Sequence, residues 1–136
     1  MGLIDFVKSA GKALGIVDIE AIQKEIEGFG LKKSGLDINV DGDKVVVEGM
    51  PSNPDEREKI IAAIGNIQGI ASVEDKMEGE PKAQFYTVKS GDTLSGIAGE
   101  VYGDGSKYPK IFEANKPMLE HPDRIYPGQV LVIPKT

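Results

Sequence analysis

The sequence predicts an α+β protein made of two small domains. Its 136 residues are enough for one domain or for two very small ones. Two observations favour two domains. Residues 77–84 are polar and contain Gly79 and Pro81, as linkers do. The order of predicted elements also differs on the two sides of this stretch, with helices and short strands mixed before it and a strand-helix-helix-strand order after it.

Residues 1–16 are predicted to form a short helix. Their apolar side chains recur at spacings of one, three and four, which would align them on one helical face. This stripe consists of Leu3, Phe6, Val7, Ala10 and Leu14. A second helix is expected after Asp18, whose side chain is a good N-cap, and it should end at residues 28–30.

Residues 36–47 are predicted to form a β-hairpin, because apolar residues alternate on both sides of Asp41-Gly42-Asp43. The same stretch also satisfies the pattern of an EF-hand calcium loop. The residues that match are Asp37, Asn39, Asp41, Gly42 and Glu48. An EF-hand loop needs a helix on each side, whereas Gly35 precedes this stretch and Pro51 follows it, so the hairpin is favoured.

Residues 64–70 form an unusual predicted turn between a helix that starts near Pro54 and a strand over 70–75. Ile64, Ile67 and Ile70 favour burial, whereas Gly65 and Gly69 permit backbone conformations that other residues resist. The last carbonyls of a helix have no partner within the helix. If this turn is buried, its carbonyl oxygens therefore need hydrogen-bond donors or a cation.

The C-terminal part is predicted to start with a strand over 85–88. Asp92 or Thr93 can cap the first helix, and Pro109 opens the second. A last strand over 130–133 ends at Pro134.

Composition and charge argue against several function classes. The net charge of −6 and an isoelectric point near 4.8 disfavour nucleic acid or an anionic membrane as the main partner. The first residues lack the basic region of a secretory signal, and no apolar run approaches the roughly 20 residues of a membrane span. We therefore expect a cytoplasmic protein with no nucleic-acid or membrane partner.

Catalysis and zinc binding are poorly supported by the residues. The chain has no cysteine, and its single histidine, His121, lies beside a proline in a predicted loop. The acidic runs at 55–58 and 74–75 are interpreted as solvated charge at a helix start and a strand end. We expect no enzyme and no organic cofactor.

The C-terminal part resembles a LysM domain, a βααβ fold. The resemblance rests on separated blocks in the right order over about 50 residues, namely 85–98, 115–117 and 125–134. Residues 18–78 resemble a BON domain, with helices packed on a small sheet. The resemblance implies an N-terminal segment over 1–17, a BON domain over 18–78, a linker over 79–84 and a LysM domain over 85–136.

The joint arrangement closely resembles the small cytoplasmic BON–LysM potassium-binding proteins of bacteria. Residues 1–3, 6–8 and 65–73 carry this part of the likeness. The resemblance implies a monomeric sensor that binds K⁺, with Rb⁺ and Cs⁺, in preference to Na⁺, and becomes compact on binding. A large monovalent ion suits neutral carbonyl oxygens. Backbone carbonyls implied as K⁺ ligands are those of Val7, Ala10, Gly11, Gly65, Ile67 and Ile70.

Two other functions stay open at this point. LysM domains commonly bind N-acetylglucosamine polymers such as peptidoglycan. The resemblance would place that site at Gly91, Asp92, Thr93, Leu94, Ile125 and Tyr126. Alternatively, Tyr102, Tyr108 and Phe112 could bind an unidentified protein partner, although these aromatic residues also fit the core of a LysM domain.

Overall fold

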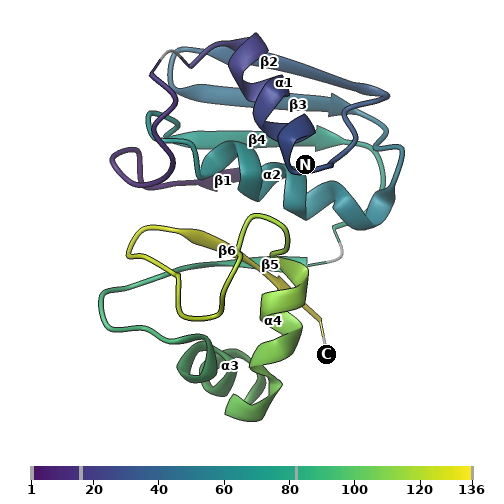
Figure 1. Ribbon diagram of the computed structural model, residues 1–136. Coiled ribbons are helices and arrows are strands. Elements are labelled where there is room, and N and C mark those ends of the chain that lie inside the picture. The colour runs from purple at the N-terminus through teal and green to yellow at the C-terminus, as the bar shows by residue number, and fades with distance from the viewer. Residues whose placement is uncertain (1, 16, 82, 136) are drawn as a thin grey trace.

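A computed structural model describes residues 2–15, 17–81 and 83–135 of the chain. It is an α+β structure with two sheets and two hydrophobic cores, as the sequence predicts (Figure 1). The N-terminal domain has a four-stranded sheet in the order β1-β4-β3-β2. Its strands are β1 (Gly2–Asp5), β2 (Leu36–Asp41), β3 (Lys44–Gly49) and β4 (Ser72–Met77).

Two helices cover one face of this sheet (Figure 1). The first, α1 (Ile19–Gly28), begins at Asp18, whose carboxylate accepts the Ala21 N–H at 2.8 Å, as predicted. The second, α2 (Arg57–Gly65), follows a short 3₁₀ turn η1 (Pro54–Glu56). Almost every residue of α2 is buried, and the helix contacts the sheet on one side and β6 of the other domain on another. A helix that is buried on all sides needs no polar face.

The predicted hairpin is confirmed: β2 and β3 pair antiparallel, with Val40 opposite Val45 and Asp41 opposite Lys44. Gly42 turns the chain at a φ of +64°. The EF-hand alternative is wrong, because strands and not helices flank this turn. Within the described ranges, moreover, no group of three or more His, Cys, Asp or Glu side chains could hold a metal ion.

The predicted helix over residues 1–16 is wrong. Residues 2–5 form strand β1, which pairs antiparallel with β4. Leu3 and Val7 of the predicted stripe are 58% and 41% exposed, while Phe6 is buried. By pairing with the otherwise free edge of β4, residues 2–5 satisfy the backbone N–H and C=O groups of both strands through contacts that are distant in sequence. Gly11 and Gly15, with φ of +102° and +83°, are incompatible with a helix there.

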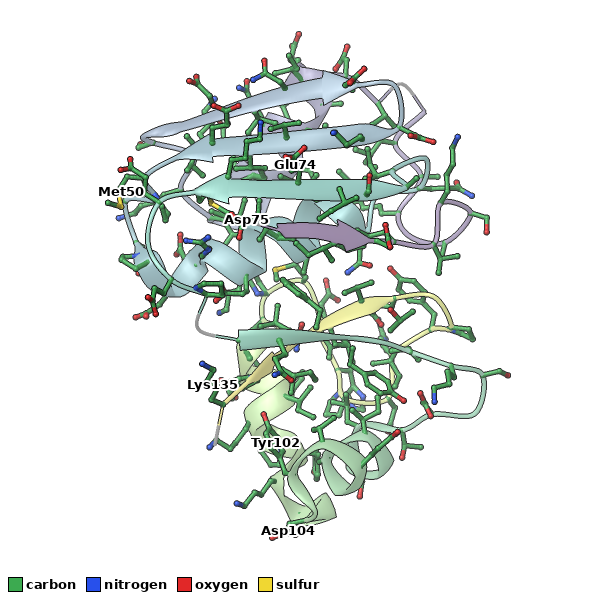
Figure 2. All side chains as sticks on the ribbon, turned by 180° about the vertical axis from the view of Figure 1, so that it is seen from behind. Met50, Glu74, Asp75, Tyr102, Asp104 and Lys135 are labelled. Atoms are coloured by element: carbon green, nitrogen blue, oxygen red, sulfur yellow. The ribbon has the colours of Figure 1, made fainter. Side chains whose placement is uncertain are left out.

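The interpretation of both acidic runs as solvated charge is wrong, because several of these charged residues are buried. Arg57, Glu58 and Asp75 are 2%, 4% and 5% exposed. Adjacent residues of a strand point to opposite faces. Glu74 accordingly lies on the open face of the sheet and pairs with Lys44 at 2.9 Å, while Asp75 faces α2 (Figure 2).

The C-terminal domain has the predicted strand-helix-helix-strand order. Strands β5 (Ala83–Thr87) and β6 (Val130–Pro134) pair antiparallel. Helix α3 (Leu94–Tyr102), turn η2 (Gly105–Lys107) and helix α4 (Tyr108–Ala114) lie between them. Tyr102 and Phe112 pack against the core of this domain, as expected if the aromatic residues belong to the core rather than to a binding patch. Tyr108 is 37% exposed.

Candidate functional site

The N-terminal loop over residues 6–12 lies along the central turn over 64–71. Four backbone bonds join them. The Phe6 N–H donates to the Ala71 carbonyl at 2.9 Å, and the Lys12 N–H donates to the Asn66 carbonyl at 2.8 Å. The Gln68 N–H donates to the Lys12 carbonyl at 2.9 Å, and the Gly69 N–H donates to the Lys8 carbonyl at 2.8 Å. Lys12 and Ile67 form an isolated parallel bridge. The structure thus brings together the two distant segments that carry the expected K⁺ ligands.

Several carbonyl oxygens in these segments keep capacity to accept. The Val7 carbonyl accepts one bond from Ala10 at 3.0 Å, and the Ile67 carbonyl accepts one from Ile70 at 3.2 Å. A carbonyl oxygen has two lone pairs, so each can take a further partner. In the parts of the chain that the structure describes, no hydrogen bond reaches the remaining four expected oxygens, those of Ala10, Gly11, Gly65 and Ile70. The segments therefore hold six uncharged oxygens with unused acceptor capacity.

Two glycines let these segments approach closely, for different reasons. A Cβ on Gly11 would lie 2.1 Å from the Asn66 carbonyl oxygen, and the φ of this residue is positive. A Cβ on Gly65 would lie 2.0 Å from ring carbons of Phe6. From the sequence, Gly65 is expected to supply a backbone conformation that other residues resist, but it is not among the glycines with a positive φ. At Gly65 the missing side chain makes room for a buried aromatic ring.

The surroundings of the segments are partly dry. Ile67 and Ile70 are 1% and 0% exposed, which confirms the prediction that these isoleucines favour burial. Val7 lies at the surface of the same loop. Water therefore has access to the N-terminal segment and to Gln68, but not to the isoleucine side chains of the central turn.

Asn66 connects this region to the C-terminal domain, a role that sequence reasoning missed. Its side-chain amide donates to the Val130 carbonyl at 2.8 Å, and its amide oxygen accepts the Val130 N–H at 2.9 Å. Gly128 packs beside the loop, since a Cβ there would lie 2.7 Å from that of Ala10. Within a turn, an asparagine gives no sequence signal for a contact with a residue 64 positions away.

The residues expected for glycan binding are divided between two surfaces. Thr93 and Leu94 line a cleft of about 400 Å³ with Ser95, Tyr108, His121, Pro122 and Asp123. Tyr126 lines a different cleft, between the domains, and Ile125 packs against the C-terminal core. Gly91 has a φ of +87° and Asp92 is half-buried at the adjoining turn. The structure does not gather these six residues around one groove.

Asp92 makes the C-terminal domain sensitive to acid. Its carboxylate accepts the Lys89 N–H and the Tyr86 hydroxyl, both at 2.8 Å, and these bonds lower the pKa of Asp92. A lowered folded-state pKa means that the stabilisation is present above the unfolded-state value and is lost as the pH falls through the folded-state value. We expect the difference in melting temperature between the wild type and Asp92→Asn to shrink as the pH falls below about 4.

Tyrosine fluorescence can measure this effect, because all four tyrosines lie in the C-terminal domain and the chain has no tryptophan. Asp104→Asn is the wrong control, since hydrogen bonds from Ser106 also lower the pKa of Asp104. Asp123, an exposed loop residue, supplies a suitable one. A constant difference between wild type and Asp92→Asn from pH 7 to pH 3 would contradict the prediction.

Across the described residues, no helix is both long and apolar enough to span a bilayer.

Comparisons with known proteins agree with this architecture. Residues 86–134 match the LysM domain family. A protein of Escherichia coli named potassium binding protein Kbp is 48% identical over 149 aligned positions, which cover 99% of each chain. An uncharacterised protein of Deinococcus radiodurans is 32% identical over 85% of this chain and 51% of its own length. A Mycobacterium tuberculosis protein named an esterase is 52% identical, but the alignment covers 39% of this chain and 11% of that protein.

The esterase likeness concerns only a short shared stretch, whereas the likeness to Kbp extends along both whole chains. The predicted resemblance is confirmed for Kbp and for the LysM domain, while the BON assignment stays a prediction. This chain belongs to the family of the potassium binding protein Kbp.

Proposed function

We propose that this protein binds K⁺ through backbone carbonyls of the N-terminal loop and the central turn, and that it acts as a cytoplasmic sensor rather than an enzyme. The ligands proposed are the carbonyls of Val7, Ala10, Gly11, Gly65, Ile67 and Ile70. The observation that carries this proposal is the direct backbone pairing of these two segments, which carry oxygens that retain acceptor capacity. A relative that aligns over 99% of both chains and is named for potassium binding supports it.

The chemistry of the site suits a large monovalent ion. Neutral carbonyl dipoles can replace the hydration shell of K⁺, whereas divalent cations favour carboxylates. Rb⁺ and Cs⁺ should bind as well, and Na⁺ should bind more weakly. We further propose that the N-terminal unit over 18–78 is a BON domain and that the ion makes the monomer more compact.

Calorimetry tests the proposal directly. Titration of KCl into protein in NaCl buffer should give saturable heat at one site per chain, and RbCl should do the same. Titration of NaCl into protein in choline chloride should give markedly weaker binding. No saturable heat with KCl would remove the proposal.

Asn66 is the residue through which ion binding should reach the C-terminal domain. Asn66→Ala keeps the backbone carbonyls but removes both bonds to Val130, which together contribute about 1–3 kcal/mol to docking. We expect the variant to bind K⁺ and yet to show looser docking of the two domains, measured as a longer distance between spin labels at Lys33 and Lys107.

Asn39→Ala is the matched control, because Asn39 lies exposed on β2 far from the C-terminal domain. An unchanged label distance in Asn66→Ala would show that other contacts hold the domains together.

Peptidoglycan binding is the second candidate function, supported by the LysM match and by the cleft at Thr93 and Leu94. Retention of the protein on purified peptidoglycan, lost in a Leu94→Asp variant that remains folded, would favour it.

A further inference from the structure

A second cleft, distinct from the one at Thr93, lies between the two domains and has a volume of about 310 Å³. Helices α1 and α2 form one side of it, and the loop between α4 and β6 forms the other. Apolar residues provide much of its wall: Phe29, Ala62, Ala63, Met118 and Leu119. This volume and apolar lining are typical of sites for small organic molecules.

Gln129 gives this cleft an unused hydrogen-bond donor. The residue is only 6% exposed, and its amide oxygen accepts the Tyr126 N–H at 3.3 Å. No described group accepts from its side-chain NH₂. Because no buried side-chain nitrogen of a described residue lacks a partner, this NH₂ is open to the cleft that the residue lines. A donor that is open to a cleft, on a residue that is otherwise buried, can bind a ligand oxygen without first breaking a bond within the protein.

Tyr126 supplies a second donor in the same wall. It lines the cleft, and burial raises the pKa of its hydroxyl, which therefore stays protonated at neutral pH. Its hydroxyl makes no hydrogen bond to another described residue. Two donors from neighbouring parts of one loop can serve one carbonyl or hydroxyl oxygen.

The charges around the cleft balance. Lys12 pairs with Glu25 at 2.9 Å, and Arg124 lies 4.0 Å from Glu120. These four residues all line the cleft, so it has no net charge to attract a phosphate or a strongly cationic ligand. The chemistry favours an uncharged molecule.

We propose that this cleft binds a small uncharged organic molecule with a flat apolar body and a carbonyl-type oxygen, which accepts hydrogen bonds from Gln129 and Tyr126. This inference goes beyond ion binding and does not depend on it. Gly11 and Asn66 also line the cleft, so bound ligand would contact the same segments that hold the proposed K⁺ ligands.

Benzamide is a suitable probe, because it is neutral, flat and carries a carbonyl oxygen. Titrated into ¹⁵N-labelled protein in K⁺ buffer and again in Na⁺ buffer, it should give saturable shifts at cleft residues with a dissociation constant on the order of millimolar. Benzoate, which has nearly the same shape but a negative charge, should bind at least about tenfold more weakly.

Gln129→Met removes the donor at nearly constant length and should weaken benzamide binding about tenfold. Gln84→Met is the matched control, since Gln84 is exposed on β5 outside this cleft, and it should leave binding unchanged. Ala63→Leu, which fills the cleft, should abolish binding if the variant folds.

Saturable shifts at cleft residues that Gln129→Met weakens would support the site. Absence of saturable shifts in both buffers, shifts centred on Thr93 and His121, or equal binding by Gln129→Met would overturn it. The K⁺ proposal is tested by a separate calorimetric titration, so failure of either proposal does not decide the other.

Discussion

Replacing Gly11 with alanine is expected to lower K⁺ affinity by about 100-fold or more. The alanine Cβ would lie 2.1 Å from the Asn66 carbonyl oxygen and 3.2 Å from the Gln68 nitrogen, both of which belong to the backbone. The residue would also have to keep a φ of +102°, which is strained for any side chain by about 1–3 kcal/mol. The loop must then move away from the central turn, which separates the two halves of the proposed ligand set. Calorimetry with KCl measures the change.

Substitutions at two other glycines distinguish the two causes of the expected loss of affinity, namely the steric clash with Asn66 and the strain of a positive φ. Gly15→Ala imposes a positive φ of +83° on alanine, but nothing lies within 4 Å of the new Cβ. Gly2→Ala has neither problem. We expect Gly15→Ala to lose some stability and little affinity. Wild-type affinity in Gly11→Ala would mean that the ion binds elsewhere. An equal loss in Gly15→Ala would mean that general strain in the loop, rather than its contact with Asn66, controls binding.

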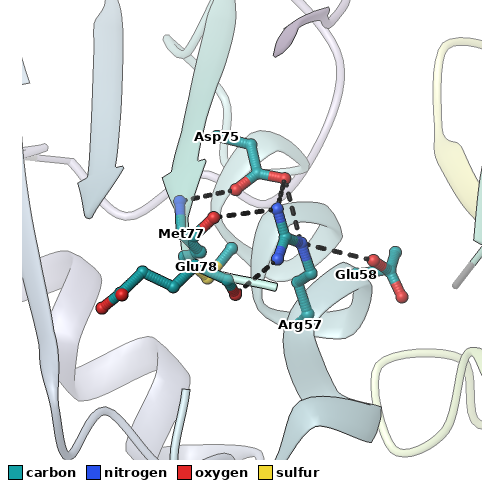
Figure 3. A network of polar contacts seen from close by, with 5 residues as sticks. All are labelled: Arg57, Glu58, Asp75, Met77 and Glu78. Atoms are coloured by element: carbon teal, nitrogen blue, oxygen red, sulfur yellow. Dashed lines mark hydrogen bonds and ion pairs between the residues drawn. The ribbon is translucent and has the colours of Figure 1, made fainter. Parts of the chain in front are cut away.

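Replacing Arg57 with methionine is expected to lower the free energy of unfolding by about 3–5 kcal/mol, because it leaves Asp75 buried without its partner. The Arg57 guanidinium donates to Asp75 Oδ2 from Nε at 3.1 Å and from Nη2 at 2.9 Å (Figure 3). It also donates to the carbonyls of Met77 and Glu78, at 3.1 Å and 2.8 Å. Urea unfolding followed by circular dichroism measures the loss.

Three variants place this result in context. Arg57→Lys keeps the charge but loses the forked geometry, so it should recover only part of the stability. Arg57→Met combined with Asp75→Leu removes the Arg57–Asp75 pair, while Glu58 stays buried, and it should be more stable than Arg57→Met alone. Lys8→Met breaks an ion pair with Asp43 whose side chains are 60% and 50% exposed, and it should change stability by less than about 1 kcal/mol. A loss that small in Arg57→Met would contradict the argument.

Local signals in the sequence predicted much of the fold. The hairpin around Gly42 and the cap at Asp18 depend on neighbouring residues, so the sequence could specify them. The predicted N-terminal helix failed because its apolar spacing competes with a long-range pairing between β1 and β4 that no local pattern contains. The acidic runs were misinterpreted for the same reason, since the burial of Asp75 depends on a guanidinium 18 residues away.

The candidate site was predictable only in part. The set of carbonyl ligands followed from the resemblance to a family and remains a proposal. The structure adds that the two segments lie together, and it adds Asn66 and Gln129. The Asn66 amide bonds across the boundary between the domains to Val130, and Gln129 lines a cleft whose opposite wall comes from distant parts of the chain. No spacing rule within one segment could have singled them out.

The short connection between the sheets has a consequence for how the protein could signal. Only residues 78–82 separate the end of β4 from the start of β5, a tether of at most about 18 Å when fully extended. The C-terminal domain therefore stays at a high effective concentration near its docking surface, so a few weak bonds are enough to hold it there. Release would change the overall radius only slightly but would permit large changes in orientation. A partner that recognises the relative orientation of the two domains would thus respond to ion binding even if the domains move closer together by only a short distance.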